Sequence, residues 1–264
     1  MEPAADPVLL DVREGVARIR FNRPAALNAI DQALADRFLA ACRAIAARDD
    51  VRVVVIGGEG RGFMAGGDVA RMRESLPAAD AFVASLLASI HPALALLAEL
   101  DAPVVASLHG AVAGAGAGIA LAADLALAAD DTRINLAYTG IGGTPDAACT
   151  WNLPRLVGLR KAMEIALLSD TVDAPEALRL GLVNRVVPAA ALEAETMALA
   201  TRLARGPTGA YGRVKRLLRA SFGRDMRQQM DAERDAFCAA ARSVDFAEGI
   251  NAFAARRKPA FVGR

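Results

Sequence analysis

The sequence predicts an α/β fold, and three observations lead to it. Short β-branched runs such as "RVVVIGG" and "PVVASLHG" each end in glycine, which is typical of strands that are covered on both faces. A helical segment follows each of these glycine turns, so strand, loop and helix repeat along the chain. The apolar fraction is 54% with only 5% aromatic residues, which favours helices packed through small side chains such as Ala. In such a fold we expect ligands at the strand ends.

The first elements can be assigned by their turn and capping residues. Residues 8–22 read as two strands around Glu14-Gly15, which is a hairpin signal. Asp31 is suited to cap an Ala-rich helix that runs to about residue 48. The run at 52–60 is a buried strand ended by glycines.

The second half of the chain contains more helix. A helix is expected over 79–100, a buried strand over 103–110, and two further strands within 125–136. From about residue 196 onward the periodicity is mainly helical. We therefore predict a core at residues 1–195, which holds the ligand site, and a C-terminal helical region at 196–264.

Composition excludes several classes of function. The net charge of +1 gives no indication of a nucleic-acid or membrane partner. The three cysteines are scattered and form no CxxC pair, so we expect neither a disulfide framework nor a metal site. The acidic N-terminus does not resemble a signal peptide. The longest apolar run, at about residues 119–129, is broken by Asp124 and is too short for a membrane span, so we expect a soluble, cytoplasmic protein.

The stretch "HGAVAGAGAGIALAAD" at 109–124 is the most unusual local feature. It does not satisfy GxGxxG, because Ile119 takes the last glycine position, and no Walker A lysine follows. Glycines between a strand and a helix either leave backbone N–H groups free for an anion or allow close packing. A second turn of this kind, "GRGFMAGGDVARM" at 60–72, follows another strand. Two such turns could direct one N–H each at a single oxygen, as an oxyanion hole requires.

With these pieces in order, the sequence resembles the crotonase (enoyl-CoA hydratase/isomerase) superfamily over essentially its whole length. The matching pieces include "FNRPAALNAI", both glycine stretches, "LPRLVGLRKAMEIALLSDTVDAPEALRLGLVNRVVP" and "EGINAFAARRKPAF". The resemblance implies a spiral of ββα turns, a C-terminal helical region that trimerises, and a CoA thioester as substrate, with no separate cofactor. It assigns the oxyanion-hole donors to the N–H groups of Gly67 and Ala115, although the family usually has glycine at the second position.

The sequence departs from the hydratases of this family at two positions. Their two catalytic glutamates correspond to Gly118 and Tyr138 here. Since a hydratase needs a pair of acids and bases to activate water and protonate carbon, ordinary hydration is disfavoured. Asp146 stands where related isomerases and 4-chlorobenzoyl-CoA dehalogenases have a functional aspartate. The alternative is that Asp146 only caps a helix that begins at Ala147.

Three reactions remain open at this stage. The motif "GGTPDAACTWNLPRLVG" is most similar to ring-opening isomerases of phenylacetate breakdown, which favours isomerisation of an enoyl-CoA with Asp146 as acid and base. Dehalogenase-like hydrolysis would use Asp146 as nucleophile and His91 as its helper, and hydratase activity is the third reading. His91 could equally be a residue at a helix start, before Pro92, and Tyr138 could orient Asp146 or simply pack. A trimer that binds acyl-CoA without turnover is the non-enzymatic alternative.

The resemblance also indicates where CoA binds and how the chain assembles. The assembly would be a homotrimer or a dimer of trimers. The basic residues are expected near the CoA phosphates and the others around the thioester. The residues expected to bind CoA are Arg23, Ala26, Leu27, Ala65, Gly67, Asp68, Val69, Gly114, Arg256 and Lys258, with Arg257 beside the last two.

Overall fold

A six-stranded sheet forms the centre of the computed structural model, which describes residues 6–264. Its spatial order is β1-β2-β3-β4-β6-β9; β1 is antiparallel to β2 and the other neighbours are parallel. The strands are β1 (Val8–Arg13), β2 (Val16–Phe21), β3 (Val53–Gly58), β4 (Val104–Leu108), β6 (Leu125–Ala129) and β9 (Arg185–Val187). The predicted hairpin is confirmed: Glu14 and Gly15 both take positive φ between β1 and β2.

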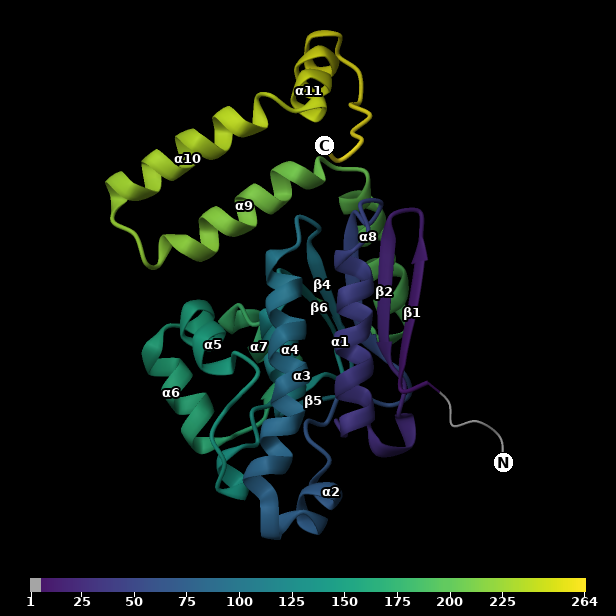
Figure 1. Ribbon diagram of the computed structural model, residues 1–264, viewed down its shortest axis with the longest axis vertical. Helices are drawn as coiled ribbons and strands as arrows, with labels where there is room; N and C mark the ends of the chain where they lie inside the picture. Colours follow the sequence, from purple (N-terminus) through teal and green to yellow (C-terminus); the bar gives the residue numbers. More distant parts are fainter. Residues whose placement is uncertain (1–5) are drawn as a thin grey trace.

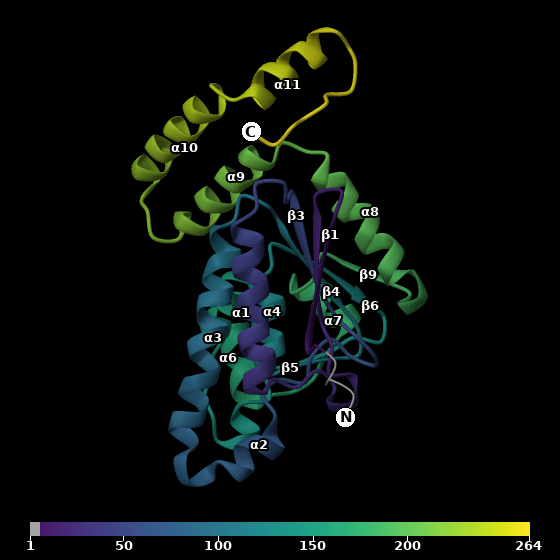
Figure 2. The ribbon, with the colours of Figure 1, turned by 45° about the vertical axis from the view of Figure 1, so that its right-hand side comes forward.

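Helices cover both faces of this sheet, as the continuous apolar strands predict. Along β3, Val54 and Ile56 belong to the core under α1 (Gln32–Ala46) and α3 (Ala79–Glu99), whereas Val53 and Val55 pack under α8 (Leu192–Ala204). Figure 2 shows α1 and α3 on one side of the strands and α8 on the other. The Asp31 carboxylate accepts a hydrogen bond from Leu34 N at 2.9 Å, so the predicted cap of α1 is confirmed.

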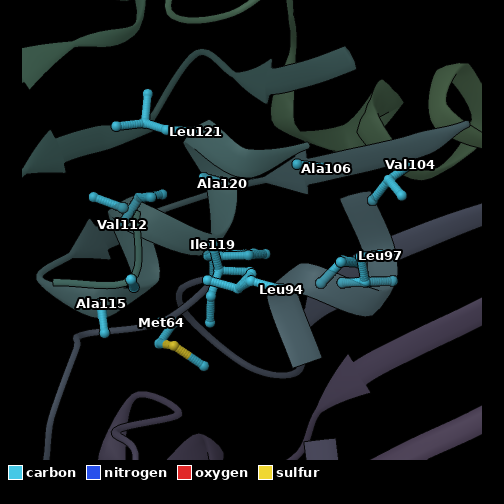
Figure 3. Packing of buried hydrophobic residues seen from close by; sticks show 14 of the residues in the cluster. Met64, Leu94, Leu97, Val104, Ala106, Val112, Ala115, Ile119, Ala120 and Leu121 are labelled. Carbon is cyan, nitrogen blue, oxygen red and sulfur yellow. The ribbon is translucent and has the colours of Figure 1, made fainter. Parts of the chain in front are cut away.

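A second, three-stranded sheet lies beside the first and continues the spiral. Its order is β5-β7-β8, and the helices around it close the lower part of the core (Figure 1). The short helix α4 (Ala115–Ala122) joins the two sheets and is buried on nearly all sides. In Figure 3, Ile119 of α4 packs against Leu94 of α3. These elements are β5 (Ala111–Ala113), β7 (Arg133–Asn135), β8 (Val172–Asp173), α2 (Val69–Glu74), α5 (Cys149–Val157), α6 (Leu159–Leu168) and α7 (Ala174–Leu180).

The C-terminal helices form an arm that projects from the core. The arm consists of α9 (Thr208–Ser221), α10 (Met226–Ala240) and α11 (Val244–Ala254), and it lies at the end of the molecule opposite α2 (Figure 1). The predicted division between residues 195 and 196 falls inside α8. Because Leu192, Thr196 and Ala200 of α8 are buried against the sheet, α8 is part of the core and the arm begins with α9.

A buried ionic cluster attaches α9 to the core. The Asp124 carboxylate, between α4 and β6, contacts Lys215 Nζ at 2.7 Å and Arg219 Nη2 at 2.8 Å. It also accepts a hydrogen bond from Val104 N, and Lys215 Nζ donates to the carbonyl of Ala102. The Lys215 side chain is only 8% exposed and that of Asp124 13%. Burial lowers the pKa of Lys215, and the nearby carboxylate opposes that shift.

The segment Leu76–Glu99 is long and apolar, contrary to the expectation that no run in this sequence could span a membrane. By length and composition it could cross a membrane, because an 18-residue window within it has a mean hydropathy of 1.9. In the structure most of it is α3, whose Leu86, Ile90, Leu94 and Leu97 are buried against the core. The apolar composition of α3 is therefore used for packing and, at its N-terminal half, for lining a cavity.

Candidate active site

The two glycine stretches meet in the structure. Gly66 and Gly114 both have positive φ, and a Cβ built on either would lie 3.2 Å from the Cα of the other. Only glycine allows this backbone conformation together with such a close approach. Backbone hydrogen bonds from Met64 N to the carbonyl of Ala111 and from Ala113 N to the carbonyl of Met64 align the two segments.

This contact places the N–H groups of Gly67 and Ala115 beside one cavity. Both residues line it, and neither N–H donates to an acceptor within residues 6–264. Ala115 is the first residue of α4, so its N–H is one of the free donors at a helix start and its backbone is helical. Alanine at this position therefore still offers its N–H to a ligand.

The later glycines in the run serve close packing. A Cβ on Gly116 would lie 2.7 Å from the carbonyl oxygen of Met64, and one on Gly118 would lie 2.6 Å from the Ala147 Cβ. The Cys149 Sγ would lie 3.0 Å from the same Gly118 Cβ. Ala147 and Cys149 thus fill the space that corresponds to the first glutamate of a hydratase. Burial raises the pKa of Cys149 to about 12, which keeps this thiol protonated at neutral pH.

We predict that Gly118→Glu will not create a hydratase and will destabilise the fold by about 2 kcal/mol or more, as overpacking of a core does. The new side chain must displace Ala147, which begins the turn into α5. Urea unfolding and hydration of crotonyl-CoA measure the two effects. Gly140→Ala is the matched control, because no atom lies within 4 Å of a Cβ there. Stable protein with new hydratase activity would contradict the packing argument.

The cavity has a volume of about 510 Å³ and mostly apolar walls. One wall comes from the loop at residues 136–146, and the opposite wall comes from α2 and the first half of α3. Its polar side chains are Tyr138, Thr144, Asp146 and Asp80. The apolar residues of the α2–α3 wall are Val69, Met72, Ala79, Val83, Leu86, Leu87 and Ile90.

Asp146 is half-buried in this cavity and is hydrogen-bonded to Tyr138. The Tyr138 hydroxyl donates to Asp146 Oδ1 at 2.5 Å. Desolvation raises the pKa of Asp146, while the Tyr138 hydroxyl and the charge of His91 oppose that shift. Burial raises the pKa of Tyr138 strongly, so its hydroxyl stays a hydrogen-bond donor. The pKa of this carboxyl group therefore lies closer to neutral pH than that of an exposed aspartate, which suits a group that both takes up and releases a proton.

The alternative reading, in which Asp146 only caps a helix starting at Ala147, does not agree with the backbone. Ala147 and Ala148 both take left-handed φ values, of 48° and 60°, and α5 starts only at Cys149. The backbone carbonyl of Asp146 accepts from Cys149 N, but its side chain caps no N–H. The carboxylate is therefore left to the cavity and to Tyr138.

His91 does not line this cavity. It lies in the middle of α3 rather than at a helix start, is exposed, and faces a separate hollow between α3, α5 and α9. Only its charge reaches Asp146.

The loop at 23–30 lies against the glycine stretch at 60–72, and its arginine is paired with carboxylates of the protein itself. Arg23 Nη2 lies 3.1 Å from Asp31 Oδ2 and 3.2 Å from Asp68 Oδ2, and Asp68 also caps α2. The fully buried Asn28 amide donates to the carbonyls of Glu59, Gly62 and Phe63, and Leu27 O accepts from Ala65 N. Arg23 thus holds the loops together.

The predicted CoA-binding residues are only partly brought together. Ala65, Gly67, Val69 and Gly114 line the cavity, and Ala26 and Leu27 form the adjoining turn. Arg256 and Lys258 follow α11 at the far end of the arm (Figure 1), away from the cavity of their own chain. Arg257 pairs with Glu248.

Two free N–H donors beside a raised-pKa carboxyl in an apolar pocket form an arrangement that is chemically suited to an oxyanion or enolate. Comparison with known proteins gives the family. The family described as enoyl-CoA hydratase/isomerase matches residues 11–264. The chain belongs to this family, the crotonase superfamily, and is one of its acyl-CoA enzymes.

Individual relatives show how mixed the reactions around this sequence are. A probable enoyl-CoA hydratase of Rhodobacter capsulatus is 37% identical over 96% of this chain and 97% of its own. The 1,2-epoxyphenylacetyl-CoA isomerase of Escherichia coli is 35% identical over 97% of this chain and 98% of its own. A crystal structure from Mycobacterium abscessus, described as an enoyl-CoA hydratase/isomerase, superposes with a TM-score of 0.93 at 37% identity, covering 97% and 100% of the two chains.

Sequence reasoning named Val69 of the α2–α3 wall but did not single out Asp80 or Asn28. Asp80 lies in no motif, and it reaches the cavity because it stands in the first turn of α3. Asn28 could have been singled out as a polar residue between apolar ones in "AALNAI".

Proposed function

We propose that the protein isomerises enoyl-CoA thioesters by moving a proton between two acyl carbons, with Asp146 as both acid and base. The observation that carries this proposal is the single carboxyl group in the cavity held by Tyr138 at 2.5 Å, close to two free backbone donors. Asp80, the other carboxylate of the cavity, is exposed on the opposite wall.

The proposed reaction needs only these groups. The thioester oxygen accepts hydrogen bonds from Gly67 N–H and Ala115 N–H, each worth about 3–4 kcal/mol for the developing oxyanion. The Asp146 carboxylate takes a proton from C2 of a 3-enoyl-CoA, and the electron pair of that C–H bond forms the enolate. The protonated Asp146 then delivers the proton to C4, the double bond moves to C2–C3, and the thioester is restored.

The same geometry disfavours the two other reactions. Hydration needs a second acid or base, and Gly118 and Tyr138 stand at those positions. A dehalogenase-like hydrolysis with His91 as helper needs the imidazole in the cavity, whereas His91 lines the neighbouring hollow.

Assembly into a homotrimer or a dimer of trimers belongs to the same proposal. The arm exposes large apolar residues, among them Phe222, Met226, Met230 and Phe237. Burying them against other copies would remove apolar area from water. Arg256 and Lys258 would then contact CoA phosphates only in a site of another copy.

Three thioesters test the proposed reaction. We expect a 3-enoyl-CoA to be converted to its 2-enoyl isomer, and crotonyl-CoA and 4-chlorobenzoyl-CoA to remain unchanged. Mass spectrometry identifies each product, because isomerisation conserves mass, hydration adds water, and dehalogenation exchanges chloride for hydroxyl. Rapid hydration or halide release would refute the proposal.

Tyr138→Phe is predicted to move the acidic limb of the kcat/KM profile to higher pH. The Tyr138 hydrogen bond favours the charged form of Asp146, so its loss leaves desolvation less opposed and raises the Asp146 pKa further. The active form is the carboxylate, and activity is then lost at a higher pH as the pH falls. Tyr211→Phe, at the other tyrosine of the chain, is the control. An unmoved limb would mean that Tyr138 does not act on Asp146.

A further inference from the structure

The charged side chains that line the cavity are both acidic. Asp146 lies on one wall and Asp80 on the other, and among residues 6–264 no Lys, Arg or His side chain lines the cavity. The remaining wall is apolar apart from Tyr138, Thr144 and backbone groups. A second anion, placed away from the Gly67 and Ala115 N–H groups that serve the thioester oxygen, would lose its hydration without gaining a cationic partner.

Of the two acidic residues, Asp146 is hydrogen-bonded to Tyr138, whereas Asp80 has no side-chain partner among residues 6–264. It lies in the first turn of α3, is exposed, and forms no ion pair or side-chain hydrogen bond within the described part of the chain. The basic residues of the neighbouring α2 are Arg71, which pairs with Glu74 at 3.1 Å, and Arg73. Neither arginine contributes to the cavity wall.

We propose that the cavity selects acyl groups without a charge, and that Asp80 is the residue that rejects acyl chains ending in a carboxylate. This inference rests on the proposed function only in taking the cavity as the acyl site. The substrates are then neutral aliphatic or cyclic acyl-CoA thioesters, and half-thioesters of dicarboxylic acids are excluded. Like charges across a partly desolvated cavity repel, and the repulsion weakens in salt.

Binding of unreactive ligands tests this inference without any turnover. Hexanoyl-CoA, 6-hydroxyhexanoyl-CoA and adipoyl-CoA (the monothioester of a six-carbon diacid) share CoA and chain length, and they differ only at the far end. By isothermal titration calorimetry at pH 7.5, we expect adipoyl-CoA to bind about tenfold or more weakly than hexanoyl-CoA. The hydroxylated ligand should lie much closer to hexanoyl-CoA, which separates charge from polarity.

Asp80→Asn should reduce that difference about threefold or more, chiefly through tighter binding of adipoyl-CoA. Glu74→Gln is the matched control, because it removes an exposed carboxylate of α2 outside the cavity. Equal affinities for hexanoyl-CoA and adipoyl-CoA, no binding of either, or an undiminished difference in Asp80→Asn would overturn the inference. If the charge selection is found but no 3-enoyl-CoA is isomerised, the proposed reaction fails and the selection stands.

Discussion

Asp146→Asn is expected to reduce kcat for isomerisation of a 3-enoyl-CoA by about 10²–10⁴-fold, the contribution of a positioned acid–base group. The amide keeps the size of the side chain and can still accept the Tyr138 hydrogen bond through its oxygen, but it cannot take a proton from C2. Thioester binding through Gly67 and Ala115 is left intact, so KM should change little. Steady-state kinetics on one 3-enoyl-CoA measures both parameters.

Asp170→Asn is the matched control for this variant, because Asp170 is an exposed aspartate outside the cavity. It should behave like the unmodified protein. Isomerisation within about threefold of the original rate in Asp146→Asn would remove Asp146 from the acid–base role.

Asp124→Ala is expected to lower the free energy of unfolding by about 3–5 kcal/mol, as the loss of one partner of a buried ion pair does. Lys215 and Arg219 would lose their shared carboxylate, and Val104 N its acceptor. The effect should also loosen the C-terminal end of α4, because Asp124 follows that helix directly. Urea unfolding followed by circular dichroism provides the measurement.

Glu164→Ala serves as the comparison, since the Lys161–Glu164 pair lies at the surface with 32% and 53% of its side chains exposed. We expect it to cost less than about 1 kcal/mol. A loss of similar size in both variants would show that burial of the Asp124 cluster adds nothing to stability.

The order of the helices and strands was predictable from the sequence, because short turn and capping motifs determine where these elements begin and end. Glu14-Gly15, Asp31 and the glycine-ended strands fix turns and caps within a few residues. The meeting of the two glycine stretches also followed from sequence. The loops after neighbouring parallel strands β3 and β4 leave from the same edge of the sheet, and both carry glycine.

Three features could not be obtained in this way. The resemblance to the dehalogenases suggested His91 as a helper of Asp146 but could not tell which face of α3 it takes. The sequence alone left open the alternative that Asp146 caps a helix, because two alanines adopt left-handed φ, which alanine does at a cost that sequence patterns do not encode. The place of Asp80 in the cavity depends on how the first half of α3, which carries no motif, packs beside the glycine stretches.

The transfer of a label between two carbons tests the central claim most directly. A 3-hexenoyl-CoA carrying deuterium at C2 is mixed with excess enzyme in ordinary water, and the product of the first turnover is examined by mass spectrometry and NMR. If one carboxyl group, Asp146, removes the C2 proton and delivers it to C4, part of the deuterium must appear at C4 of 2-hexenoyl-CoA. Complete loss of the transferred deuterium, or a product that has gained water, would contradict the account.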